Sequence, residues 1–161
     1  MILQKAFTLT QGGADTAAET TIATNIQPGI TLDAWAVKAI EFTIKPDLMK
    51  AWANVDSDFT VQFTKRSLTG SIARIVTFTD TDLISSYSLA INAAGTPATL
   101  SIVPATFFLV MPADILVYSE NLYAQIISTA TGQTNVAWGR ILYETRKLSQ
   151  SEALSVVASR P

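Results

Sequence analysis

Apolar and polar residues alternate along much of the chain, so apolar side chains recur at every second position rather than every third or fourth. The segments 40–45 and 59–64 show this most plainly, because isoleucine, phenylalanine or valine occupies every other position. Successive side chains of an extended strand point to opposite faces, so this period places the apolar residues on one face. Both segments are therefore predicted to be β-strands with one buried and one polar face.

The same reasoning predicts most of the remaining structure. Further strands are expected at 72–78, 82–91, 100–103, 106–111, 115–118, 122–128 and 135–147. Turn-forming residues lie between them, at 93–97, 111–114, 119–121 and 131–133. About eight to ten short strands without alternating helices indicate an all-β sandwich or barrel rather than a parallel α/β sheet.

Two segments have helical signals. Residues 46–55 begin with proline and carry an acid in the first turn, and their apolar residues are spaced for one face of a short helix. Ser149-Gln150-Ser151-Glu152 has the form of a capping box, and apolar residues at 153, 154, 156 and 157 follow it. These features predict a short helix between two strands and a second short helix at the C-terminal end.

The first 31 residues differ in composition from the rest, because they are rich in threonine, alanine and glycine. We expect them to form an extended arm or a loosely paired strand. The chain is thus divided into an N-terminal arm at 1–31 and one sandwich domain at 32–161.

The composition indicates that the chain has more apolar surface than one domain of this size buries in its core. Of the 161 residues, 48% are hydrophobic and only 15% are charged, and the mean hydropathy is +0.30. The longest apolar run, 105–111, lies between Pro104 and Pro112 and is far shorter than the roughly 20 residues of a membrane-spanning helix. The apolar surplus is therefore expected to be buried in contacts between subunits.

The chain contains no cysteine and no histidine. Disulfides, thiolate zinc sites, cysteine nucleophiles and Ser-His arrangements are thereby excluded, and we expect no enzyme activity. A formal net charge of −2 and a pI near 5.0 argue against a dedicated nucleic-acid binder. Residues 1–9 lack the apolar core of a signal peptide, so no secretion signal is expected.

Four aspartates are candidate metal ligands. Asp56 and Asp58 stand at alternate positions, as do Asp80 and Asp82, and alternate acids in a loop can supply several of the six to eight oxygens that calcium takes. The interpretation that we favour is that these aspartates cap turns at strand ends. We therefore expect no resident cofactor, with calcium at subunit contacts as the alternative.

Two adjacent basic pairs are the candidates for contact with nucleic acid: Lys65 with Arg66, and Arg146 with Lys147. Each pair could contact phosphate, but two pairs in a net-acidic chain predict only weak, non-specific binding. Solvated strand ends or ion pairs between subunits are the favoured alternative.

The run 106–111 contains the candidate residues of a subunit interface, Phe107, Phe108 and Met111. Consecutive large apolar residues cannot all face one core, because a strand has two faces. Both faces of this run must therefore be covered, with a neighbouring subunit as the preferred cover and an arm or a helix as alternatives. The other aromatic residues are expected in the core, with a sugar-stacking platform or a subunit contact as the alternative.

A resemblance to a known family is centred on residues 118–149. The segment Tyr118-Ser-Glu-Asn-Leu-Tyr-Ala-Gln-Ile-Ile-Ser-Thr-Ala-Thr-Gly-Gln is followed by Val136-Ala-Trp-Gly-Arg-Ile-Leu-Tyr-Glu-Thr-Arg-Lys-Leu-Ser. A strand of alternating aliphatic residues, a loop with glycine and a long last strand resemble the closing strands of small single jelly-roll capsid proteins of icosahedral viruses. The resemblance implies a jelly-roll β-sandwich of about eight strands that assembles into a shell. Many coats of this type carry a basic arm, and this chain departs from them in having none.

We therefore predict a structural subunit that assembles with itself, as a symmetric homo-oligomer, into a closed shell. The preferred shell is a viral capsid, so the expected location is the virion, with synthesis in the host cytoplasm and other capsid proteins as candidate partners. The alternative is a trimeric β-sandwich adhesin or virion spike module that binds a glycan or a receptor. A third class, a glycan-active enzyme, would need a pair of carboxylates in a cleft.

Overall fold

The computed structural model describes residues 1–44, 57–68, 75–77, 79–91, 106–129, 131 and 134–158. The expected helix at 46–55, the expected strand at 100–103 and the candidate ligand Asp56 lie outside these residues. Among the described residues, no helix has the length and apolar character needed to cross a membrane.

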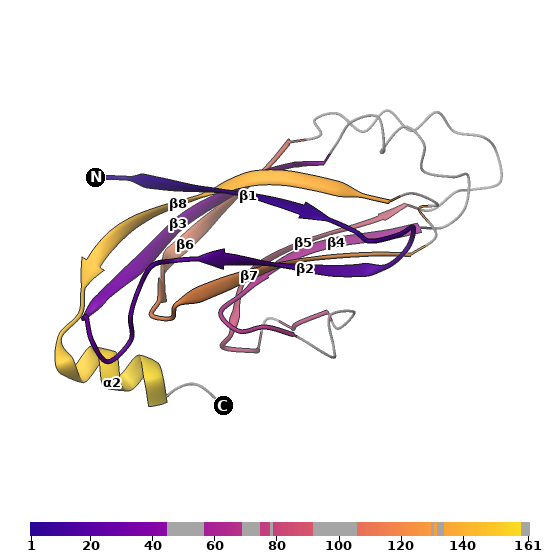
Figure 1. Cartoon of the computed structure of the whole chain (residues 1–161). Helices are drawn as coiled ribbons and strands as arrows, with labels where there is room; N and C mark the ends of the chain where they lie inside the picture. Colours follow the sequence, from indigo (N-terminus) through magenta and orange to yellow (C-terminus); the bar gives the residue numbers. More distant parts are fainter. Residues whose placement is uncertain are drawn as a thin grey trace.

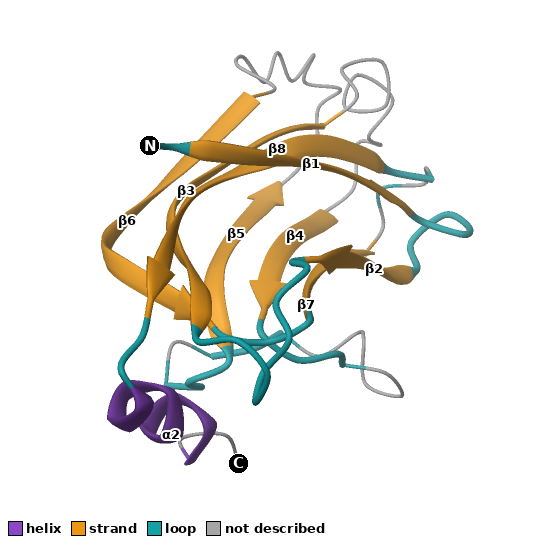
Figure 2. Ribbon diagram, turned by 60° about the vertical axis from the view of Figure 1, so that its left-hand side comes forward, coloured by secondary structure: helices purple, strands orange, loops and turns teal. Residues whose placement is uncertain are grey.

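Eight strands and one short helix make up the described chain (Figure 1). They are β1 Leu3–Thr10, β2 Ala17–Ala23, β3 Asp33–Ile44, β4 Ser57–Thr64, β5 Leu83–Ile91, β6 Thr106–Val117, β7 Asn121–Thr129, β8 Val136–Lys147 and α2 Gln150–Ala158. All strand pairs are antiparallel, and the strands form two four-stranded sheets. Sheet A has the order β1-β8-β3-β6 and sheet B the order β2-β7-β4-β5, and the two sheets face each other (Figure 2).

The order of pairing defines the topology. The first strand pairs with the last, β2 with β7, β3 with β6 and β4 with β5, so the chain is one long hairpin that has been rolled up. Rolling sets β8 beside β3 and β7 beside β4, which closes the two sheets. This arrangement is the jelly-roll sandwich, and it confirms the predicted fold class.

The core lies between the inner faces of the two sheets and is rich in aromatic residues. The ring of Phe42, on β3, is fully buried, and its centroid lies 5.1 Å from that of Phe107, 6.0 Å from Tyr87 and 6.2 Å from Phe63. Edge-on and offset rings at these separations add stabilisation to that of area burial. Strands from both sheets are thereby joined through one aromatic cluster.

Residues 1–31 were expected to form an extended arm or a loosely paired strand, and they supply one paired strand to each sheet. β1 pairs with β8 over eight residues and β2 pairs with β7 over seven. Phe7, Leu9 and Ile22 are at most 7% exposed and belong to the core. The physical reason is that β8 and β7 would otherwise present open edges, and the alternation at Phe7 and Leu9 fits a strand that covers one of them.

The segment 106–118 also differs from the expectation of two strands separated by a turn. Residues 106–117 form one strand, β6, and the turn expected at 111–114 is instead an irregularity, where the register against β3 shifts between Val37 and Ala39. Pro112 is accommodated because β6 is an edge strand of sheet A, where a missing backbone N–H is tolerated. Of the expected strand at 72–78, the part described as 75–77 is not in a strand.

The C-terminal helix is confirmed, together with its capping box. The backbone N–H of Glu152 donates to Ser149 Oγ at 3.2 Å, and the backbone N–H of Ser149 donates to Glu152 Oε2 at 2.8 Å. Of the apolar residues on α2, Ala153 is buried, whereas Leu154 and Val157 are 65% and 43% exposed. The helix therefore leaves most of its apolar side chains uncovered.

Candidate subunit interface

The outer face of sheet A is defined by three rows of neighbouring side chains, each crossing β1, β8, β3 and β6 in that order. The rows are Gln4–Leu142–Ala39–Val110, Ala6–Arg140–Glu41–Phe108 and Thr8–Trp138–Thr43–Thr106. They alternate with inward-facing residues such as Phe42 and Ile141, which are fully buried. These twelve residues make up the outer face of sheet A.

This outer face carries large apolar side chains in solvent. Phe108 is 56% exposed, Val110 is 65% exposed and Trp138 is 42% exposed. Isolated apolar residues on a surface are ordinary, but three that share one sheet face form a patch of the kind that marks an interaction site.

The outer face of sheet B is different, because it is polar and covered by the protein itself. Gln62 and Gln125 lie side by side on it and are fully buried. Gln62 Oε1 accepts from the backbone N–H of Val76 at 2.9 Å, and Gln125 Nε2 donates to Glu19 Oε2 at 2.8 Å. The backbone N–H of Leu68 donates to the same carboxylate at 2.8 Å. Segments between β4 and β5 thus cover sheet B, and among the described residues no comparable segment covers the apolar rows of sheet A.

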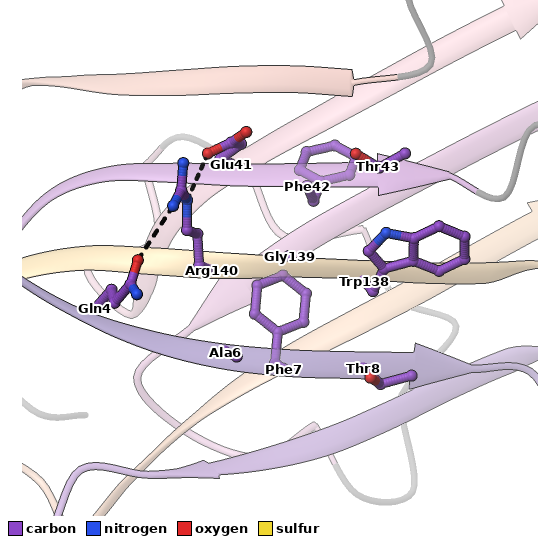
Figure 3. A pocket seen from close by; sticks show the side chains of 10 residues that line it. All are labelled: Gln4, Ala6, Phe7, Thr8, Glu41, Phe42, Thr43, Trp138, Gly139 and Arg140. Atoms are coloured by element: carbon purple, nitrogen blue, oxygen red, sulfur yellow. Dashed lines mark hydrogen bonds and ion pairs between the residues drawn. The ribbon is translucent and has the colours of Figure 1, made fainter.

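An ion pair occupies the centre of the outer face of sheet A. Arg140 Nε donates to Glu41 Oε2 at 2.7 Å, and Arg140 Nη1 donates to Gln4 Oε1 at 3.1 Å (Figure 3). A hollow of about 600 Å³ lies beside this pair, over β1, β8 and β3, and the indole of Trp138 borders it. Polar groups and an aromatic ring therefore surround one shallow depression.

Gly139 explains how β8 and β3 come together under this hollow. A Cβ atom at Gly139 would lie 2.7 Å from the Cα of Phe42, 2.9 Å from its Cβ, and still closer to the carbonyl oxygen of Glu41. Only glycine fits such an approach to a neighbouring backbone. The close approach keeps the Phe42 ring in the core and the adjacent Arg140 and Glu41 within reach of each other.

The candidate interface residues are divided between two faces. Phe107 and Met111 pack against the core, whereas Phe108 points outward with Val110. Phe108 therefore stays a predicted interface residue. Val110 and Trp138 are exposed on the same outer face. Val110 lies in the run 106–111 but was not singled out, although it lies two residues from Phe108 on the same side of the strand. Trp138 was expected in the core, with a subunit contact as the alternative.

Three of the candidate metal ligands, Asp58, Asp80 and Asp82, lie among the described residues, and these three are not gathered at one place. Asp80 Oδ2 lies 3.6 Å from Arg66 Nη2, and Asp82 Oδ2 contacts Arg66 Nε, so a guanidinium lies between the two carboxylates. Asp58 lies at the other end of β4, eight residues before Arg66. Across the described part of the chain, no group of three or more potential metal ligands is assembled.

The basic pairs lie at strand ends, and both arginines have acidic partners. Arg66 contacts two aspartate carboxylates, and Arg146 Nη2 donates to Glu152 Oε1 at 2.6 Å. Lys65 Nζ donates to the carbonyl oxygen of Thr81 at 2.9 Å. Lys147 is exposed at the end of β8. Much of the positive charge expected to meet phosphate is therefore compensated within the chain.

A series of contacts between charged side chains borders the outer face, where the register of β3 shifts between Val37 and Ala39. Lys38 Nζ donates to Asp114 Oδ1 at 2.7 Å, and it lies 3.4 Å from Glu144 Oε2. The hydrogen bond with Asp114 raises the pKa of Lys38, and the hydrogen bond with Lys38 lowers the pKa of Glu144. These side chains are solvent-exposed, so the contacts fix orientation more than they add stability.

A second apolar depression, of about 560 Å³, lies between α2 and the loop that precedes β3. Ile30, Leu154 and Val157 are exposed around it. The hydroxyl of Tyr118 holds the loop, since it donates to the carbonyl oxygen of Thr31 at 2.7 Å and accepts from the backbone N–H of Gly29 at 3.0 Å. The depression is therefore built on a well-fixed loop.

Comparison with known proteins supports the fold of the chain. No protein-family model and no curated protein matches the sequence. Among solved structures, the chain is similar to VP1 in a mutant of the unassembled pentamer of Washington University polyomavirus, with a TM-score of 0.54 and 10% identity, over 91% of this chain and 95% of that one. It also aligns with a chain of tomato aspermy virus, with a TM-score of 0.43 and 14% identity, over 93% of this chain and 80% of that one. The first similarity, like the strand order, agrees with the jelly-roll fold that the resemblance in the sequence implied.

Proposed function

We propose that this chain is a structural, non-enzymatic subunit that assembles with copies of itself into a closed shell, and that this shell is a viral capsid. The observation that carries the proposal is the uncovered apolar patch of Phe108, Val110 and Trp138 on the outer face of sheet A. A jelly-roll sandwich can bury both inner faces within one chain, so apolar residues on an outer face favour burial against another protein.

Two further features support the same function. The neighbour of similar fold is a pentamer, so this architecture is one that assembles in at least one other protein. The chain has no histidine or cysteine with which most hydrolytic sites are built, which favours a structural role. A capsid subunit would be located in the virion.

The mass of the purified protein in solution tests the proposal. A closed shell of many copies has a mass far above that of the 17.3 kDa chain and appears as uniform particles in electron micrographs. A species that stays at 17.3 kDa over a wide range of concentrations would contradict the proposal.

A second candidate function is a trimeric adhesin or spike module that binds a glycan. The hollow beside Trp138 favours it, because an exposed indole next to Gln4, Glu41 and Arg140 combines a stacking surface with hydrogen-bonding groups. A particle of three times 17.3 kDa, together with a change in Trp138 fluorescence on addition of an oligosaccharide, would support this candidate over the shell.

One secondary contact belongs to the proposal, and a resident cofactor does not. Lys65, Arg66, Arg146 and Lys147 would provide weak, non-specific contact with nucleic acid when many copies act together. No resident cofactor is proposed, and the position of Arg66 between Asp80 and Asp82 argues against calcium at those two carboxylates.

A further inference from the structure

We infer that two copies of this chain meet face to face through the outer face of sheet A, about a two-fold axis that runs parallel to the strands between β8 and β3. This contact deepens the proposed function, on which it rests, by naming the surfaces through which two subunits meet. A two-fold contact uses the same surface on both copies, so the surface must be complementary to itself.

The charges of the outer face satisfy this requirement. Rotation about the stated axis sets β3 of one copy over β8 of the other. Each row of one copy then lies opposite the same row of the other copy, in reverse strand order. Arg140 of each copy then faces Glu41 of its partner, because these two residues are neighbours across β8 and β3 in the central row. The side chains of Arg140 and Glu41 are 49% and 28% exposed, so each remains accessible for a second, intermolecular contact. The result is a ring of alternating charges in which every guanidinium has two carboxylate neighbours.

The sizes of the side chains are complementary in the same way. Under this rotation Phe108 faces Ala6, Trp138 faces Thr43 and Leu142 faces Ala39 of the other copy. Three of the large side chains therefore meet smaller ones, which favours interdigitation of the two sheets, whereas Val110 meets Gln4 of the other copy.

The hollow in Figure 3 has a specific place in this contact. Ala6 lines it, so the ring of Phe108 from the partner copy would enter the hollow at one border of the face, and the symmetric insertion would occur at the other border. The volume of about 600 Å³ is sufficient for a phenyl ring. The most exposed aromatic side chain of the face is thereby buried, and water is displaced from the hollow.

A different axis does not satisfy these conditions. A two-fold axis that crosses the strands through the central row would place Arg140 over Arg140 and Phe108 over Phe108 of the partner. Like charges would then oppose each other at the centre, which disfavours that arrangement.

Charge exchange tests the contact directly. Glu41→Arg makes residues 41 and 140 both positive, and Arg140→Glu makes them both negative. The association of each variant with itself should therefore be weaker than that of the natural chain by about tenfold or more. An equimolar mixture of the two should recover association, because each positive face now meets a negative one. The measurement is sedimentation equilibrium of each variant and of the mixture at micromolar concentration, where a dimer has twice the 17.3 kDa mass of the chain.

Two further variants complete the test. Ala6→Trp fills the hollow without touching the ion pair, and should weaken association because Phe108 can no longer enter. Glu120→Arg makes the same charge change as Glu41→Arg at an exposed turn outside the outer face, and should associate like the natural chain. Circular dichroism establishes that each variant is folded.

The outcomes separate this contact from the shell. Failure of the mixture to associate, or unchanged association of either charge variant, overturns the two-fold contact, and large particles that persist in both variants leave the shell proposal standing. Dimers that follow the charge exchange without larger particles support the contact and contradict the shell. A misfolded variant is not repaired by mixing, so recovery in the mixture cannot arise from a folding defect.

Discussion

Gly139 is the residue on which the closest approach of two strands in sheet A depends. A methyl group at this position would overlap the backbone of β3 at Glu41 and Phe42, rather than the movable end of a side chain. We therefore predict that Gly139→Ala lowers the free energy of unfolding by about 3 kcal/mol or more, because backbone must move to relieve the overlap. Chemical denaturation measures this change.

Gly12→Ala is the matched control for that prediction. A Cβ atom at Gly12 would meet no other atom within 4 Å, so the same added methyl group should be tolerated. Equal stability of the two variants would show that β8 and β3 do not approach as closely as the structure has them.

The lowered pKa of Glu152 predicts that the stability of the C-terminal helix depends on pH. Hydrogen bonds from the backbone and side chain of Ser149, followed by the charge of Arg146, lower the pKa of Glu152. A carboxyl whose pKa is lowered in the folded state stabilises that state above its unfolded pKa, and this contribution is lost as the pH falls through the lowered value. We expect the first turn of α2 to open as the pH falls below the ordinary titration range of a glutamate carboxyl.

Amide hydrogen exchange of residues 150–158 as a function of pH checks this prediction. Glu152→Gln removes the titrating group and keeps an acceptor at the same place, so its helix should open to the same extent at all pH values tested. A pH dependence that survives in Glu152→Gln would have to come from another group.

Local chemistry of this kind was predictable from the sequence, whereas contacts between distant residues were not. The capping box at Ser149 and Glu152 depends on a spacing of three residues, and the structure confirms it. The contacts of Arg66 with Asp80 and Asp82 join residues at least fourteen positions apart, so the spacing of the aspartates could suggest turn caps or calcium but not an arginine partner.

At the scale of elements, β1 shows how an N-terminal segment becomes part of a sandwich. Leu9 on β1 is 1% exposed and lies in the core, and β1 covers the edge of β8. Leu9→Ala should therefore lower the free energy of unfolding by about 2–5 kcal/mol, through lost burial and the cavity left behind. Thermal or denaturant unfolding measures this loss.

Thr8→Ala is the control, because Thr8 is exposed on the same strand and its replacement should change stability by less than about 0.5 kcal/mol.

Removal of residues 1–31 should abolish the cooperative transition, since it takes one strand from each sheet. A truncated chain that still unfolds cooperatively would show that these residues form a separate arm after all.

The alternation of residues predicts strands but not their partners. It identified β4, β5, β7 and β8, and of β3 only residues 40–44, because residues 34–37 are buried on both faces and do not alternate. It divided β6 in two, because Pro112 and Asp114 are ordinary turn residues and nothing local shows that the strand lies at an edge. It left β1 and β2 as either an arm or a loosely paired strand, because short strands with few large apolar residues become evident only once their partner edges are known.

At the scale of the whole molecule, the two outer faces differ in a way that the sequence does not reveal. Gln62 on sheet B and Arg140 on sheet A each stand at a polar position of a strand in which apolar and polar residues alternate. Gln62 is nevertheless fully buried, whereas Arg140 is half exposed. The difference arises from the segment after β4, which folds over sheet B and places the backbone N–H of Val76 on Gln62. The candidate interface could therefore be predicted as far as Phe108, but the choice of sheet face required the fold.

The same whole-molecule distribution of charge predicts how the subunit responds to nucleic acid. Four basic residues at strand ends would give a log-log salt slope of roughly −3 to −4 if each neutralised a phosphate of duplex DNA. Arg66 and Arg146 already contact carboxylates, so each contributes less to phosphate binding than an unpaired arginine would. We therefore expect weak binding by the chain, with a slope shallower than roughly −3 to −4.

Glu152→Gln tests whether the internal ion pairs set that slope. It frees Arg146 for phosphate, so the slope should become steeper by about one, whereas Asp58→Asn changes the net charge equally at the opposite end of β4 from Arg66 and should leave the slope unchanged. Fluorescence anisotropy of a labelled duplex at a series of salt concentrations measures all three slopes. Equal steepening in both variants would show that net charge alone governs binding, and tight binding that persists at high salt would contradict the view of this chain as an acidic structural subunit.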